Sequence, residues 1–107
     1  MNLISRLKNI ENLIKMEKLR ELHQYLLKNN IDSFKPVVNI DRICQYLIDN
    51  KGNRIFYNIN SDDWKIKIRI KCVKDDNVIT FLDEPIYMDL FAKSKRDVLS
   101  IINSRMS

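Results

Sequence analysis

Hydrophobic residues in the first quarter of the chain recur with the period of an α-helix. Residues 2–29 contain neither Gly nor Pro and are rich in Leu, Ile, Lys and Glu, a composition that favours helix. The apolar residues of this segment fall on two faces: Leu3, Leu7, Ile10 and Ile14 on one, and Met16, Leu19, Leu22 and Leu26 on the other. The faces are rotated by roughly a third of a turn, so we expect two helices, or one helix with a break near residues 15–17.

A second apolar stripe with helical spacing follows a connector at residues 31–38. Its members recur at i, i+3, i+4, i+7 and i+8: Ile40, Ile43, Cys44, Leu47 and Ile48. Asn39 or Asp41 suits the N-cap of such a helix, and Gly52 suits its end. The pattern therefore predicts a helix over residues 39–50, which makes residues 1–50 a helical part of the chain.

From residue 53 the period of the pattern falls to two, which is typical of strands. Residues 53–59 and 64–73 alternate between apolar and polar side chains, and turn-forming residues separate them from a third apolar run at 78–82. Residues 86–91 form either a fourth strand or, after Pro85, the start of a helix. Consecutive short strands predict an antiparallel meander of three or four strands over residues 53–91.

The last segment returns to helical spacing. Ser94 followed by Asp97 is a variant of the capping box, and apolar residues from Val98 to Met106 supply one helix face. The chain is thus predicted to be one α+β domain over residues 1–107, with N-terminal helices, the meander, and a C-terminal helix over 94–106.

Composition narrows the possible chemistry. The chain contains a single Gly, which excludes glycine-rich phosphate loops and nucleophile elbows. Cys44 and Cys72 lie far apart and His23 is the only histidine, so we expect no metal site, no cofactor and two reduced cysteines. Asp63-Trp64-Lys65 has the D-x-K spacing of metal-dependent nucleases, but this short spacing arises often by chance. We therefore expect no catalytic residues.

The net charge of +5 is concentrated in one segment. Residues 51–77 carry seven basic and four acidic side chains, and the alternation of the strand at 64–73 places four of the basic ones on one sheet face. With their neighbours on the preceding strand, the predicted partner-binding residues are Lys65, Lys67, Arg69, Lys71, Arg54 and Phe56. An ordinary solvated sheet face is the competing interpretation of the same pattern.

These observations favour a small non-catalytic binding protein that neutralises or modulates one macromolecular partner, such as an immunity protein, an antitoxin or a phage-type inhibitor. A basic face predicts a protein partner with an acidic patch. The alternative is an RNA- or DNA-binding module, in which an aromatic ring beside a row of cations stacks on bases. No apolar run is long enough to span a membrane, and no signal peptide precedes the first helix, so we expect a cytoplasmic location and no membrane partner.

The alternative extends to a small ribonuclease. The segments Trp64–Arg69 and Phe91–Asp97 resemble parts of RelE-type ribosome-dependent ribonucleases, which are small basic α+β proteins. The resemblance is confined to these segments, and those toxins begin with a strand where this chain is predicted to begin with a helix. No residue role is carried over from it.

Overall fold

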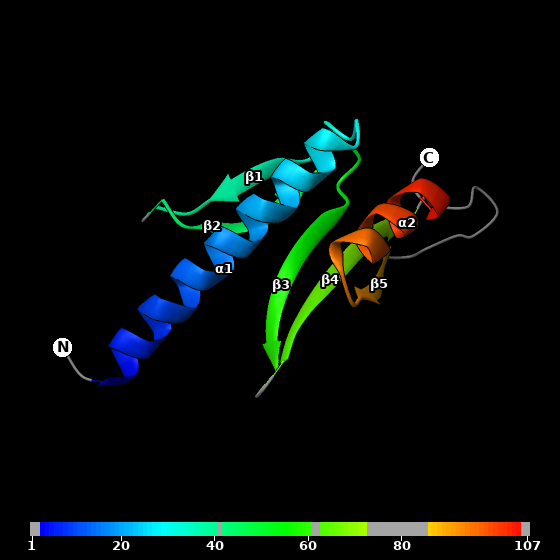
Figure 1. Cartoon of the computed structure of the whole chain (residues 1–107). Coiled ribbons are helices and arrows are strands. Elements are labelled where there is room, and N and C mark those ends of the chain that lie inside the picture. Colours follow the sequence, from blue (N-terminus) through cyan, green and yellow to red (C-terminus); the bar gives the residue numbers. More distant parts are fainter. Residues whose placement is uncertain (1–2, 41, 61–62, 73–85, 106–107) are drawn as a thin grey trace.

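The computed structural model describes residues 3–40, 42–60, 63–72 and 86–105, and its elements are shown in Figure 1. In chain order they are α1 (Leu3–Lys28), β1 (Lys35–Val38), β2 (Cys44–Ile48), β3 (Arg54–Asn60), β4 (Asp63–Cys72), β5 (Ile86–Ala92) and α2 (Lys95–Arg105). The strands form one antiparallel sheet in the order β1-β2-β3-β4-β5. The α+β prediction is confirmed, but the sheet has five strands instead of three or four. The predicted strand at 78–82 lies outside the described residues.

Helix α1 is one helix that continues without interruption through residues 15–17. Its two apolar faces meet different surroundings: Leu22 and Leu26 are fully buried, whereas Ile10 and Ile14 are 52% and 40% exposed. The second half of α1 packs on the sheet, while the first half extends beyond it (Figure 1). The phase slip in the sequence therefore marks a change of environment along one helix.

The end of α1 is built from the two asparagines that follow it. Asn30 has a φ of 65°, and the N–H of Ile31 donates to the carbonyl of Leu26 at 2.9 Å, as in a Schellman motif. The N–H of Asn30 donates to the carbonyl of Leu27 at 3.2 Å. These bonds satisfy carbonyls of the last turn and lead the chain back towards the sheet.

The predicted helix over residues 39–50 is wrong, because this segment forms the turn and the second strand of the β1–β2 hairpin. Asn39 closes its turn: the Asn39 side-chain oxygen accepts from the N–H of Ile43 at 2.9 Å, and the Asn39 N–H donates to the Ile43 carbonyl at 3.0 Å. The side chain expected to cap a helix therefore stabilises a turn, a role that Asn also favours. Since α1 ends at Lys28 and β1 begins at Lys35, the predicted helical part at 1–50 is corrected to α1 alone.

A β-bulge explains why this strand resembles a helix in sequence. The register with β1 shifts between the pairs Val37–Tyr46 and Val38–Cys44, so one extra residue lies on β2. Cys44 and Leu47, three residues apart, are consequently both buried in the core. Spacing of three is the helical signal, whereas Ile40, a member of the same stripe, is 97% exposed.

The β2–β3 turn is tied to β4 by two polar side chains. The Asp49 carboxylate accepts from the N–H of Asn53 and from its side-chain amide, each at 2.8 Å. The buried Asn53 oxygen then accepts from the N–H of Lys71 at 2.9 Å, which extends the β3–β4 ladder by one bond. Gly52 has a φ of +90°, and a Cβ there would lie 3.0 Å from Cδ of Lys71. The turn thus requires Gly.

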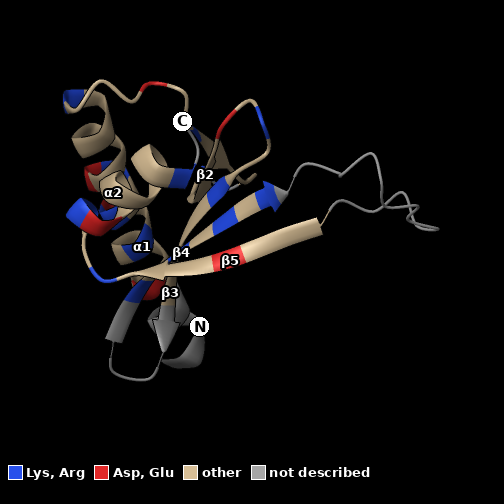
Figure 2. Cartoon of the chain, turned by 90° about the vertical axis from the view of Figure 1, so that its right-hand side faces the viewer, with Lys and Arg blue, Asp and Glu red and all other residues tan. Residues whose placement is uncertain are grey.

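Both helices pack on the same side of the sheet, as Figure 2 shows from the edge. α1 contacts β2 and β3, α2 contacts β5, and Lys95 lies 3.8 Å from Glu21 between the two helices. The capping prediction for α2 is confirmed by the Asp97 N–H, which donates to the Ser94 hydroxyl at 3.2 Å. No helix in the described ranges has the length and apolar character needed to cross a membrane.

Candidate binding face of the sheet

The side of the sheet away from the helices carries every predicted site residue. We call it the open face, and its described members on β2–β5 are Tyr46, Ile48, Arg54, Phe56, Asn58, Lys65, Lys67, Arg69, Lys71, Tyr87, Asp89 and Phe91. Strict alternation produces this division, since Ile66, Ile68 and Ile70 between the cations of β4 are buried. Five of these members are cations and one is a carboxylate.

The register arranges the open face in rows that cross the strands. Phe56 is paired with Lys67, and Lys67 with Phe91, while Tyr46 lies beside Phe56 on β2 with the two ring centroids 5.1 Å apart. We call these four residues the aromatic row. In the next row Arg54 is paired with Arg69, and Arg69 with Asp89. Strands lie about 4.8 Å apart, so a row that crosses four strands is about 14 Å long.

Cations and rings on the open face contact one another. Lys67 Nζ lies 4.9 Å from the centre of the Phe56 ring, and Arg69 Cζ lies 5.7 Å from the same ring and 5.8 Å from that of Tyr87. Arg54 Cζ lies 5.3 Å from the Tyr46 ring and 6.0 Å from the Tyr87 ring. Such cation–π contacts hold the long basic side chains against the sheet and lower the entropy they would lose on binding.

Asp89 is the one carboxylate of the open face among the described residues, and Arg69 holds it. Arg69 Nε and a terminal nitrogen donate to the two Asp89 oxygens at 2.9 and 3.2 Å. Hydrogen bonding from Arg69 lowers the pKa of Asp89, and the charge of Lys67 acts in the same direction. The carboxylate is therefore ionised near neutral pH and is a weak proton acceptor.

Arg54 differs from its neighbours in one respect. Its Nε is buried and has no hydrogen-bond partner within the described part of the chain, although the guanidinium stacks near two rings. A buried donor without a partner raises the free energy of the isolated protein by about 1–3 kcal/mol. An acceptor supplied by a ligand at this position would recover part of that cost.

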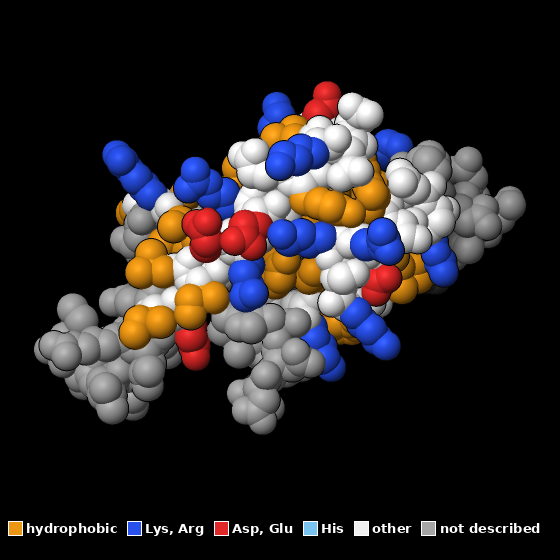
Figure 3. All heavy atoms as spheres, viewed as in Figure 1, with side chains coloured by type: hydrophobic (Ala, Val, Ile, Leu, Met, Phe, Trp, Pro, Cys, Tyr) orange, Lys and Arg blue, Asp and Glu red, His pale blue; other side chains and the backbone are white. Residues whose placement is uncertain are grey.

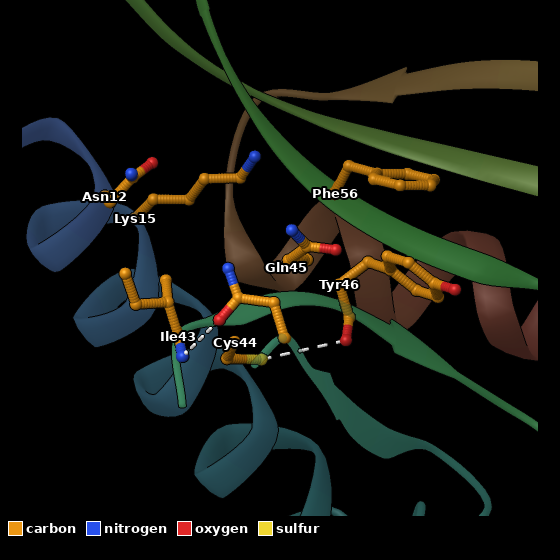
Figure 4. A pocket seen from close by; sticks show the side chains of 8 residues that line it. Asn12, Lys15, Ile43, Cys44, Gln45, Tyr46 and Phe56 are labelled. Atoms are coloured by element: carbon orange, nitrogen blue, oxygen red, sulfur yellow. Dashed lines mark hydrogen bonds between the residues drawn. The ribbon is translucent and has the colours of Figure 1, made fainter. Parts of the chain in front are cut away.

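A hollow opens where β2 and β3 separate. Only two pairs, Leu47–Ile55 and Ile48–Arg54, are in register between these strands, and beyond them β2 diverges from β3. The hollow has a volume of about 280 Å³ (Figure 4), and its lining comes from α1, the β1–β2 hairpin and β3: Asn12, Lys15, Asn39, Ile43, Cys44, Gln45, Tyr46 and Phe56. It shares Tyr46 and Phe56 with the aromatic row.

Other candidate groups have structural roles or lie outside the described residues. His23 Nε2 donates to the carbonyl of Phe34 at 3.1 Å and joins α1 to the loop after it. Burial raises the pKa of the Cys44 thiol, whose sulfur donates to the Tyr46 carbonyl at 3.7 Å. Within the described ranges no three His, Cys, Asp or Glu side chains gather as metal ligands. The side chain of Asp63, from the D-x-K spacing, is outside the described set.

The helix side of the molecule has a different surface. Basic and acidic side chains are interspersed over α1 and α2 (Figure 3), whereas the open face gathers cations and rings along β3–β5. The two sides therefore differ in how charges are mixed, because the one described carboxylate of the open face is already paired with Arg69.

Sequence reasoning placed the six basic and aromatic residues of β3 and β4 together but missed the other six members of the open face, among them three rings and a carboxylate. Tyr46 was hidden by the helix predicted for its segment. Tyr87, Asp89 and Phe91 alternate with Met88 and Leu90, so their common face was readable once residues 86–91 were treated as a strand. The pairing of Asp89 with Arg69 required the register between β4 and β5.

Comparison with known proteins adds no relative: no family model matches the chain, and neither a curated protein nor a solved structure matches it. A proposed function must therefore rest on the residues of this chain alone. Their arrangement on the open face is the most specific feature among the described residues.

Proposed function

We propose that this protein is a non-catalytic binding module whose open face binds single-stranded nucleic acid. The observation that carries the proposal is the interleaving of four aromatic rings with cations on one sheet face. Single-strand binding proteins combine basic grooves that follow the phosphates with rings on which successive bases stack. Phe91 is 60% exposed, which leaves its ring available to a base.

The two kinds of row suit the two parts of a nucleotide. The aromatic row offers Tyr46, Phe56 and Phe91 to bases, and Arg54 with its neighbours in the adjacent row offers charge to phosphates. Rows on one face of a sheet lie about 7 Å apart, which is close enough for one strand to contact both. The proposal assigns no general base, because the one described carboxylate of this face, Asp89, is already paired with Arg69.

Binding of a fluorescent oligothymidylate, followed by anisotropy across a salt series, tests the proposal. Replacing Phe91 by Ala is expected to weaken binding by about 1–3 kcal/mol while leaving the salt dependence unchanged, because a stacking contact carries no charge. Replacing Lys65 by Gln is expected to reduce the slope of log K against log salt by about 0.7, since one phosphate contact is lost. Arg20→Gln, an exposed charge change on α1, is the matched control and should leave the slope unchanged.

The absence of oligothymidylate and oligouridylate binding at 50 mM salt would contradict the proposal. Gel analysis of the RNA after incubation distinguishes binding from cleavage, and the proposal predicts an intact strand. A shortened strand would instead favour a small ribonuclease.

A second candidate is a neutralising protein that binds an acidic surface of one protein partner. The observation in its favour is that Tyr and Arg, which carry most of the energy in protein interfaces, meet at Tyr87, Arg54 and Arg69. This candidate predicts that wild-type protein captures one stoichiometric protein from its host. The capture should be lost in the Arg54→Ala variant and should persist after nuclease treatment.

A further inference from the structure

The hollow between β2 and β3 lies at the end of the aromatic row. Tyr46 and Phe56 form its rim on the open face, while Asn12 and Lys15 of α1 reach it from the helix side through the gap where the strands diverge. A nucleic-acid strand bound along the aromatic row would therefore reach the hollow at the point where β2 and β3 are no longer paired.

The lining combines apolar side chains with polar groups that have free hydrogen-bonding capacity. Ile43 and the rings of Tyr46 and Phe56 provide the apolar part, whereas the Gln45 amide and the Lys15 ammonium point into the same space (Figure 4). Neither polar group makes a hydrogen bond or ion pair within the part of the chain that the structure describes. Half of the lining residues are polar, so the hollow joins apolar walls that suit a flat ring to polar groups that can fix its orientation.

We infer that the hollow binds the base of one nucleotide, turned out of the strand on the open face, and that it favours a base with exocyclic carbonyl oxygens. The inference rests on the proposed function and names its specificity site. The volume of about 280 Å³ is near the lower limit for small-molecule sites and suits one base better than a larger group. Unstacked bases of single strands are recognised by rings on their faces and hydrogen bonds at their edges.

Lys15 decides the preference among bases. An ammonium group only donates hydrogen bonds, so it pairs with exocyclic carbonyl oxygens, of which thymine and uracil have two and guanine and cytosine one. Adenine has no exocyclic carbonyl: its acceptors are ring nitrogens, and its exocyclic amino group donates, so an ammonium group aimed at the exocyclic position meets another donor. The Gln45 amide both donates and accepts, so it serves a carbonyl and the ring N–H next to it, as thymine offers them.

The test compares affinities for labelled dT8 and dA8 in wild type, Lys15→Met and Gln45→Ala. We expect wild type to prefer dT8, and each variant to weaken dT8 binding by about fivefold or more while changing dA8 binding less than about twofold. The self-stacking of dA8 is the same for every variant, so the change in the ratio reports the hollow. Arg20→Gln removes a cation of α1 away from the hollow and should leave the ratio unchanged.

An equal loss for both oligonucleotides would overturn the inference, since Lys15 would then contact a phosphate, while the proposed function would stand. An unchanged ratio in both variants would overturn it as well. If neither oligonucleotide binds wild type, the proposed function fails and this inference fails with it. Circular dichroism and thermal unfolding establish that each variant is folded.

Nuclear magnetic resonance provides a second test. The side-chain amide signals of residues that only stabilise the fold would not change when an oligonucleotide is added. Addition of dT8 is expected to shift the side-chain amide signals of Asn12 and Gln45, whereas that of Asn50, exposed in the β2–β3 turn, serves as the control. Equal shifts at all three amides, or none at Asn12 and Gln45, would contradict a base in the hollow.

Discussion

Arg69 makes three kinds of contact at once on the open face. Its backbone position is opposite Arg54 on β3, and its guanidinium bonds both oxygens of Asp89 and lies beside the Phe56 ring. Two like charges opposite each other repel, and the Asp89 carboxylate offsets part of that repulsion. The Arg69–Asp89 ion pair is exposed to solvent, so it contributes little to folding stability and acts mainly by orienting Arg69.

Cys44 provides a test of the core at single-residue scale. Burial raises the pKa of its thiol, whereas the unfolded thiol ionises near its ordinary pKa, so the unfolded state loses its proton first. The contribution of Cys44 to stability is therefore complete below about pH 8.5 and falls as pH rises above that value.

Urea unfolding at pH 7.0, 8.5 and 9.5 measures this contribution. The free energy of unfolding of wild type is expected to fall between pH 8.5 and 9.5, by at most about 1.4 kcal/mol per pH unit from one thiol. The Cys44→Ala variant should be less stable at pH 7.0 and should show a smaller fall. An identical fall in the two proteins would show that Cys44 is not the titrating group.

At the scale of elements, α1 shows how one helix serves two environments. Its composition favours helix over the whole segment, and both apolar faces have similar residues, yet among the described side chains the fully buried leucines, Leu19, Leu22 and Leu26, all lie in the second half. Which half packs depends on where the sheet ends, and this is set by the lengths and register of β2 and β3. The same dependence explains the error at residues 39–50, where pairing with β1 overrides a helical spacing.

Two leucines of α1 test this division. Leu22 is fully buried and Leu13 is 55% exposed, although both lie in the same helix and have the same intrinsic preference for it. Leu22→Ala is expected to lower the free energy of unfolding by about 2–5 kcal/mol through lost burial and a cavity. Leu13→Ala is expected to change it by less than about 0.5 kcal/mol in urea titration. Similar losses would mean that the first half of α1 is also packed in solution.

At the scale of the whole molecule, the formal charge of +5 has less meaning than its distribution. The helix side mixes signs, and the open face holds five described cations against one carboxylate that is already paired. A sheet covered on one side only leaves such a face available for a partner, because the helices satisfy the apolar side by themselves. The proposed function uses the face that folding does not bury.

The Asp89→Asn variant distinguishes the effect of charge on the open face from the effect of the net charge of the protein on oligonucleotide binding. The substitution removes the two bonds to charged Asp89 oxygens and frees Arg69 for a phosphate, so oligothymidylate affinity should rise and the salt slope should steepen by about 0.7. Asp32→Asn, in the loop after α1, changes the net charge equally and is the control, because it leaves the open face unaltered. Equal effects of the two substitutions, measured by anisotropy, would indicate only long-range attraction.

Sequence periodicity by itself was sufficient for β3, β4 and α2, for the helical character of α1, and for the six predicted residues on one sheet face. It left open a break in α1 and the choice between strand and helix at residues 86–91. Local rules determine these features: alternation assigns faces in a strand, and capping residues end helices. Tertiary structure decided the β1–β2 hairpin, the membership of Tyr46 and Asp89 in the open face, and the hollow. Each of these depends on pairing between residues distant in the chain, and a one-residue bulge or a diverging strand changes that pairing without a distinct local signal.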